Sequence, residues 1–108
     1  MVVKINNVEF SAEYMRTPDE ISKGMMGRDI LNGCMVFKMK KGHHTFWMKN
    51  CNISLDIVFV MDNRITKIHS NCQPCDECKE RFSGFGDYVI EFPSGTAKNW
   101  KIGDYVIL

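Results

Sequence analysis

Three cysteines, Cys72, Cys75 and Cys78, recur at every third position of a polar segment. Cysteines separated by two residues can present two thiolates to one metal ion from a tight turn. A structural zinc site needs four ligands, so His69 or a histidine of the 43–44 pair would have to complete it. The same spacing fits a disulfide that pins the loop, or a redox dithiol. The pattern therefore favours plain thiols or a disulfide first, a zinc site second and redox chemistry third.

Sulfur and imidazole groups also gather between Cys34 and Cys51, where three methionines accompany His43 and His44. Such soft ligands suit copper. The methionines, however, fall on the expected core face of their strands, where methionine commonly fills gaps. The chain has no nucleophile elbow and no glycine-rich phosphate loop. A pairing of Cys51 with one of the two histidines stays open, and nothing in the sequence singles it out.

A tryptophan and two charged residues are expected to point away from the core. Side chains alternate between the two faces of a strand. This alternation places Trp47 and Lys49 opposite a core face made by Met35, Phe37, Met39, Phe46 and Met48. It likewise turns Asp56 away from Ile53, Leu55, Ile57 and Phe59. Trp47, Lys49 and Asp56 could form a recognition patch, although a plain surface ion pair between Lys49 and Asp56 is the favoured interpretation.

The elements that must position these residues are mostly strands. Residues 2–5 and 8–14 predict a hairpin around Asn6-Asn7, and Thr17-Pro18-Asp19-Glu20 predicts the start of a short helix. Further strands are predicted at 34–39, 45–49, 53–61, 65–69, 88–92 and 105–108, with a hairpin loop at 40–44 and a long polar loop at 70–86. The expected fold is α+β and mainly β, an antiparallel barrel-like or sandwich sheet of about seven or eight short strands with one short N-terminal helix.

Length and charge narrow the function classes. The 108 residues fit a single domain, residues 1–108. A net charge of +1, with no long basic run, gives no reason to expect a nucleic-acid partner. The apolar runs are too short for a membrane span, and the N-terminal residues lack a secretory pattern. We therefore expect a soluble protein in the cytoplasm of the producing cell, where thiols usually stay reduced.

The chain resembles the domain of unknown function 192 family over nearly all of its length after the first hairpin. Ser54 stands where the family has proline, and Cys51 stands where threonine is usual. The resemblance implies a compact β-rich fold and no established activity. It also leaves a phage origin open, with a role in the virion or in host interaction. The blocks that carry it are Thr17-Pro18-Asp19-Glu20, Gly24-Met25-Met26-Gly27-Arg28, Gly33-Cys34-Met35-Val36-Phe37, Phe46-Trp47-Met48-Lys49-Asn50, Ile53 to Phe59, Pro74-Cys75 with Cys78, Phe92 to Ala97 and Ile102-Gly103-Asp104.

The leading functional prediction is a non-catalytic binding or interaction module for a small ligand or a protein partner. Amphipathic aromatic and cationic groups together are typical of recognition surfaces. The first alternative is a metal-binding or thiol-redox protein, with zinc as the candidate cofactor, and the second is a small hydrolase. The candidate binding residues are Arg28, Trp47, Lys49, Asn50 and Asp56, and the candidate metal or disulfide residues are Cys72, Cys75, Cys78 and His69.

Overall fold

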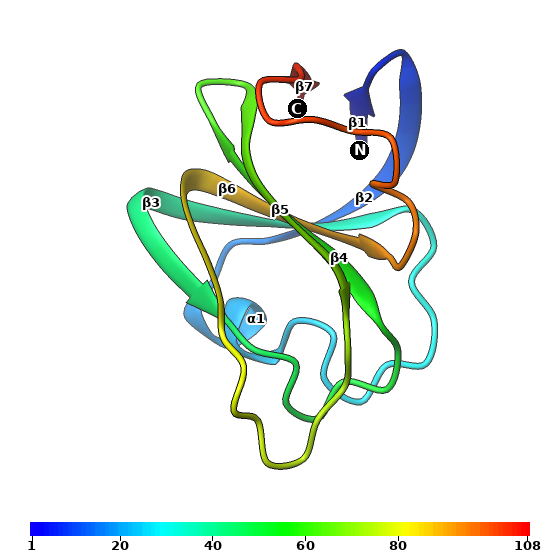
Figure 1. Ribbon diagram of the computed structural model, residues 1–108, viewed down its shortest axis with the longest axis vertical. Coiled ribbons are helices and arrows are strands. Elements are labelled where there is room, and N and C mark those ends of the chain that lie inside the picture. The colour runs from blue at the N-terminus through cyan, green and yellow to red at the C-terminus, as the bar shows by residue number, and fades with distance from the viewer.

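A computed structural model describes all 108 residues and shows one strongly curled mixed sheet of seven strands. The strand order is β5-β4-β6-β3-β2-β1-β7 (Figure 1). The mainly β fold with one short helix is as predicted. Element bounds are β1 Val2–Ile5, β2 Val8–Met15, α1 Pro18–Lys23, β3 Cys34–Phe46, β4 Leu55–Met61, β5 Arg64–Cys72, β6 Phe82–Pro93 and β7 Val106–Ile107.

Local sequence explains the N-terminal elements. Asn6 and Asn7 adopt positive φ angles of 49° and 66°, which asparagine tolerates and which a tight hairpin turn between β1 and β2 needs. The Thr17 side chain accepts a hydrogen bond from the Glu20 backbone N–H, and the Glu20 carboxylate accepts one from Thr17 in return. This capping box fixes the first turn of α1, as the sequence predicts.

The sheet is not wholly antiparallel, which corrects the expected topology in one place. β2 pairs with β3 in parallel, and the other five strand pairs are antiparallel. Parallel neighbours need a crossover that returns the chain to the same end of the sheet. Residues 16–33, which include α1, form that crossover and lie across one mouth of the curl (Figure 1).

The predicted hairpin around residues 40–44 is wrong. Cys34–Phe46 is one continuous strand, β3, and its partner is the equally long β6. A bulge between Lys38 and Gly42 bends β3 without ending it. The lysines, glycine and histidines of this stretch have the composition of a turn, but pairing with β6 keeps them extended.

The two faces of the central strands are both buried. Val58 and Val60 of β4 point into one core cluster, whereas Ile57 and Phe59 point into the other. The unbroken apolar run 57–61 is the sequence signal of such two-sided burial. The first core cluster is Val3, Ile5, Cys34, Val36, Val58, Val60, Ile65, Ile90, Phe92, Ala97 and Val106. The second is Met25, Leu31, Met35, Phe37, Met48, Leu55, Ile57, Phe59, Cys72 and Val89.

No helix has the length and apolar character that a membrane crossing requires.

Candidate functional site

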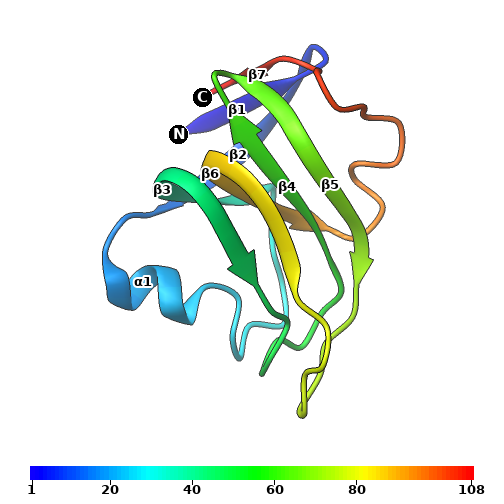
Figure 2. The same cartoon turned by 60° about the vertical axis from the view of Figure 1, so that its left-hand side comes forward.

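A pocket of about 210 Å³ opens between α1, β3 and the segment that follows β3. Figure 2 shows α1 and the turn after it lying beside the C-terminal end of β3. The volume exceeds the ~150 Å³ of an engineered cavity that binds benzene and falls below the ~300 Å³ of drug-sized sites. The apolar part of its lining includes Ile21, Met25, Phe37, Met39, Phe46 and Trp47, and the polar part includes Lys23, Thr45, Lys49, Cys51 and Glu91. We call it the Glu91 pocket.

Glycine is required where α1 ends against this pocket. Gly24 caps the helix with φ +43° and ψ −122°. A Cβ atom there would lie 3.1 Å from Cζ of Phe37, closer than nearly all such contacts. The missing side chain therefore lets the helix end approach β3 and leaves room for the pocket.

Glu91 is the one acidic residue of the pocket wall. It lies on β6 in register with Met35 of β3 and Ile57 of β4, so its side chain belongs to the face of the second core cluster. Only 4% of Glu91 is exposed, and its Oε1 atom has no hydrogen-bond partner. Burial raises the pKa of this carboxyl to about 8. Sequence reasoning missed Glu91, although an acidic residue between Ile90 and Phe92 in an apolar strand was the available signal.

Trp47 lies at the edge of the pocket and carries two cations on its ring. It follows the end of β3 and is 40% exposed. The Lys49 Nζ atom lies 5.1 Å from the indole centre, and the Arg81 guanidinium carbon lies 4.7 Å from it. Both distances are within the range of cation–π attraction. Of the predicted patch residues, Trp47 and Lys49 are therefore brought together, and Arg81 joins them.

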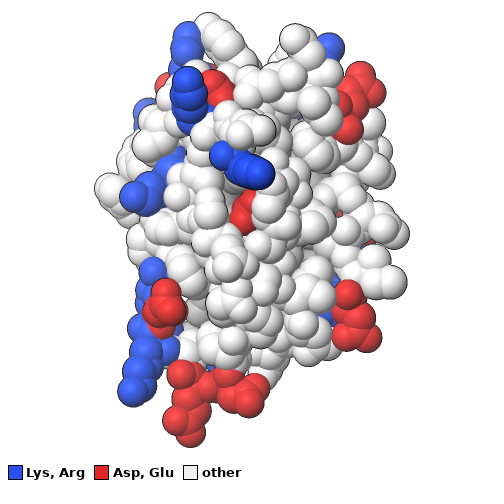
Figure 3. Space-filling model, turned by 45° about the vertical axis from the view of Figure 1, so that its right-hand side comes forward, with Lys and Arg blue, Asp and Glu red and all other residues white.

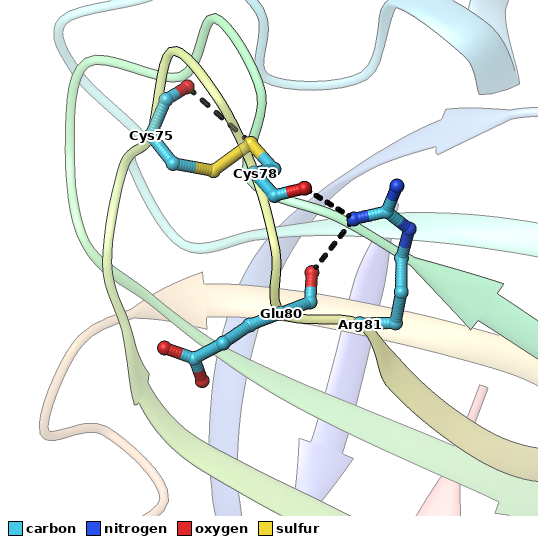
Figure 4. Close-up of a disulfide and its surroundings, with 4 residues drawn as sticks. All are labelled: Cys75, Cys78, Glu80 and Arg81. Carbon is cyan, nitrogen blue, oxygen red and sulfur yellow. Dashed lines mark hydrogen bonds between the residues drawn. A yellow bond between two sulfur atoms is a disulfide. The ribbon is translucent and has the colours of Figure 1, made fainter.

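The cysteine loop between β5 and β6 supports this arrangement. Cys75 and Cys78 form a disulfide, and the Arg81 guanidinium donates hydrogen bonds to the carbonyls of Cys78 (2.9 Å) and Glu80 (3.1 Å) (Figure 4). Cys75 also pairs through its backbone with the segment that carries Trp47. Its N–H donates to the Met48 carbonyl at 3.4 Å, and its carbonyl accepts from the Asn50 N–H at 3.3 Å. The loop thus holds both Arg81 and the residues after Trp47.

The candidate zinc ligands are not gathered into one group. The sulfurs of Cys75 and Cys78 are bonded to each other, and Cys72 is buried with its thiol donating to the His69 carbonyl at 3.4 Å. The His69 ring is engaged elsewhere, with its Nε2 atom 2.8 Å from the Ser83 carbonyl oxygen. Nowhere do three or more histidine, cysteine, aspartate or glutamate side chains converge as metal ligands.

Arg28 is engaged elsewhere. Its guanidinium makes two hydrogen bonds of 2.7 Å to the two carboxylate oxygens of Glu13 on β2. Both side chains are partly exposed. This bidentate ion pair ties the crossover to the sheet, and Arg28 is not among the residues that line the Glu91 pocket.

Asp56 is buried, which corrects the expectation that it faces solvent. It is 1% exposed and accepts hydrogen bonds from the backbone N–H groups of Asn71 (2.8 Å), Gly95 (3.0 Å) and Ala97 (2.9 Å). Alternation did turn Asp56 away from Ile57, but the opposite face of β4 is also covered. Asp56 therefore fixes the loop after β6 and the end of β5 to β4, and it makes no ion pair with Lys49.

Asn50 supplies backbone geometry. Its φ angle of 60° lies in the left-handed region, which asparagine tolerates better than most residues. Its carbonyl accepts a hydrogen bond of 2.8 Å from the Gly27 N–H. Asn50 thus connects the turn after α1 to the cysteine loop, and its exposed side chain is not among the pocket-lining groups.

The three free thiols are poorly suited to nucleophilic chemistry at neutral pH. Burial raises the pKa of Cys34 to about 12, that of Cys51 to about 11 and that of Cys72 to about 12. Since the thiolate is the reactive form, these cysteines are protonated and unreactive near pH 7. The two histidines proposed for Cys51 make other contacts: His44 bonds to the Lys40 carbonyl, and His43 packs edge-on against Phe85.

Charges are mixed on the face shown in Figure 3. Basic side chains lie mainly along the left side of this view, and acidic side chains lie at its lower end and on its right side. Uncharged atoms separate the groups, so this face has no continuous stripe of one sign.

The comparisons with known proteins agree with this fold. A family model described as Uncharacterized ACR, for the domain of unknown function 192, matches residues 1–107. The chain belongs to the domain of unknown function 192 family. One similar solved structure, a protein of unknown function from Novosphingobium aromaticivorans, is 34% identical with a TM-score of 0.90, over 99% of this chain and 84% of that one.

A second solved structure supports the fold alone. It is a Sinorhizobium meliloti protein described as a proposed transcription regulator, 24% identical with a TM-score of 0.86, over 98% of this chain and 89% of that one. No curated protein matches this domain of unknown function 192 member.

Proposed function

We propose that this protein is a non-catalytic binding module and that the Glu91 pocket takes the apolar part of a small anionic ligand. The observation that carries the proposal is an open apolar pocket with the Trp47 ring and a lysine held on that ring at its edge. Concave, mostly apolar sites with a few placed polar groups are the usual form of ligand sites.

The apolar lining supplies the affinity. Ring or alkyl surface that leaves water for the walls formed by Phe37, Phe46 and Met25 gains roughly 25 cal/mol for each Å² buried. Methionine adds adaptability, because its unbranched side chain can adjust to differently shaped ligands. The volume admits a single ring or a short branched chain, so the rest of a larger ligand would stay outside.

The lysines of the pocket determine which chemical group the ligand carries at its exposed end. Lys23 and Lys49 both line the pocket, and neither makes an ion pair with an acidic residue, since the one ion pair of the protein joins Arg28 to Glu13. Lys49 is held in place by the Trp47 ring, so less side-chain entropy is lost when it meets an anion. A carboxylate or phosphate at the mouth therefore has a preformed partner.

The test is binding of 4-methylbenzoate, a ring with one carboxylate, followed by amide chemical shifts in NMR titration. We expect a Kd on the order of 1 mM, because about ten non-hydrogen atoms at roughly 0.4 kcal/mol each give that affinity. Shifts should concentrate at Gly24, Met26 and Lys49 and leave Asn6 unaffected. Lys49→Ala should weaken binding about fivefold, whereas Lys67→Ala on exposed β5 should not. Shifts that appear elsewhere, or none up to 20-fold above ~1 mM, would overturn the proposal.

A phage origin and a cytoplasmic location stay predictions.

A further inference from the structure

The Glu91 carboxyl has no role in the fold that its contacts reveal. It sits in the wall of an apolar pocket, makes no hydrogen bond through Oε1 and faces no basic partner within ion-pair distance. A buried polar group without a partner lowers stability, by an amount comparable to a lost hydrogen bond or more. Leucine or methionine at this position would fill the same space without that cost.

The other buried acid of the protein shows what a structural carboxylate looks like here. Asp56 accepts three backbone hydrogen bonds and is fully used in the folded chain. Glu91, at a comparable burial, has none. The contrast indicates that the hydrogen-bonding capacity of Glu91 is unused within the folded chain and is available to a group that enters the pocket.

We propose that the pocket recognises a small ring or branched alkyl compound with an N–H donor at its buried end, which hydrogen-bonds to the Glu91 carboxyl group, and an anionic group at its exposed end, which meets Lys49. This inference rests on the proposed function and names its ligand class. Aminobenzoates have this chemistry, and so do aliphatic analogues with the amine and the carboxylate at opposite ends.

A donor on the ligand is required because of how a carboxyl group behaves in both protonation states. Whether Glu91 is neutral or ionised, it retains an oxygen that accepts a hydrogen bond, whereas it can donate only when protonated. Burial raises the pKa of Glu91 to about 8, so the neutral form predominates at pH 7 and the carboxyl needs no counter-charge. An N–H group from the ligand then donates to the carboxyl group without leaving an unpaired buried charge.

The distribution of charged groups along the pocket also sets the orientation in which the ligand binds. Lys23 comes from the last turn of α1 and is exposed, and Lys49 is half-buried beside Trp47, so positive charge lies towards solvent. Glu91 is 4% exposed and lies on the face of the second core cluster. A ligand with a carboxylate and an amine at opposite ends of a ring can satisfy both ends at once in one orientation only.

The experiment compares 4-aminobenzoate with 4-methylbenzoate at pH 7 by NMR titration of the full chain. The two compounds share a ring, a carboxylate and nearly the same size, and differ in the N–H donor. We expect 4-aminobenzoate to bind about tenfold more tightly to the wild type, the effect of one hydrogen bond to a buried, otherwise unpaired acceptor. Equal affinities would overturn the inference and leave the proposed function standing.

Two variants assign the effect to residue 91. Glu91→Met removes both oxygens at nearly constant shape and should abolish the tenfold preference, measured as the ratio of the two dissociation constants in that variant. Glu91→Gln keeps a carbonyl oxygen and should retain most of the preference. A preference that persists in Glu91→Met would contradict the inference. If neither compound binds the wild type at all, both the inference and the proposed function fail.

Discussion

The guanidinium carbon of Arg81 lies 4.7 Å from the centre of the Trp47 ring, and the same guanidinium donates a 2.9 Å hydrogen bond to the carbonyl of disulfide-bonded Cys78. Arg81 therefore links the disulfide-bonded loop directly to the Trp47 ring at the edge of the pocket. A cation held over an exposed indole contributes roughly 0.5–1 kcal/mol. So weak a contact depends on the disulfide, because the disulfide keeps the loop that holds the Arg81 guanidinium closed.

Reduction of the Cys75–Cys78 disulfide should loosen this contact. In a Trp100→Phe background, we expect dithiothreitol to increase acrylamide quenching of the remaining Trp47 fluorescence, because Arg81 no longer covers the ring in a fixed position. The Cys75→Ser/Cys78→Ser variant should show the increased quenching without reductant. It should also unfold at lower urea concentration, losing up to about 2 kcal/mol, the chain-entropy value for so short a loop. Quenching that is identical before and after reduction would show that the loop holds Arg81 without the disulfide.

Glu91 should make stability depend on pH. Its pKa in the folded protein is raised to about 8 from an ordinary value of 4.5, so between these values the folded state binds more protons than the unfolded state. The free energy of unfolding should therefore fall as pH rises through this window, with a slope of up to about 1.4 kcal/mol per pH unit. The nearby Cys51 and Cys72 thiols have pKa values of about 11 and about 12 and stay neutral over this range.

Urea unfolding at several pH values between 5 and 8 measures that slope. Glu91→Gln should flatten it, since the amide does not titrate. Glu13→Gln is the matched control, because its hydrogen bond with Arg28 lowers the pKa of Glu13 and places its titration below this window. An unchanged slope in Glu91→Gln would mean that another group carries the pH dependence.

Asp56→Ala should be among the most damaging single substitutions in the chain. It leaves the N–H groups of Asn71, Gly95 and Ala97 without their acceptor in a buried site. We expect a loss of about 3 kcal/mol or more in the free energy of unfolding. Asp76→Ala, at an exposed position of the cysteine loop, should change stability by less than about 0.5 kcal/mol. Similar effects of the two substitutions would show that Asp56 is not a structural anchor.

Arg28→Ala should affect stability slightly and ligand binding not at all. Its ion pair with Glu13 is partly exposed, and such pairs contribute about 0–1 kcal/mol. Titration with 4-methylbenzoate should give the wild-type Kd. Binding that is fivefold weaker, as expected for Lys49→Ala, would show that Arg28 takes part in ligand binding.

The free thiols should react slowly with iodoacetamide. With pKa values of about 12 for Cys34, about 11 for Cys51 and about 12 for Cys72, less than about one part in a thousand of each is thiolate at pH 7.5. Mass spectrometry after brief labelling should show little modification, and Cys51, the half-buried one, should react first as the pH is raised. Rapid labelling of Cys51 at neutral pH would instead support the thiol-redox or hydrolase alternative.

The sequence by itself determined the local elements and the class of fold. The Asn6-Asn7 turn and the capping box at Thr17 depend on residues next to each other in the chain, and these predictions agree with the structure. The assignment of Met35, Phe37 and Met48 to a core face is also confirmed, because alternation along a strand is a local property.

Tertiary structure alone decided what lies over each face and which distant residues meet. Local alternation turns Asp56 and Ile57 to opposite sides of β4, but only the folding of the 94–97 loop over one side buries Asp56. Glu91, Lys49 and Trp47 line one pocket because β6 pairs with β3 and because the cysteine loop holds the segment after β3. Strand pairing between segments far apart in sequence depends on the whole hydrophobic pattern, so no short stretch of residues encodes the pocket that results.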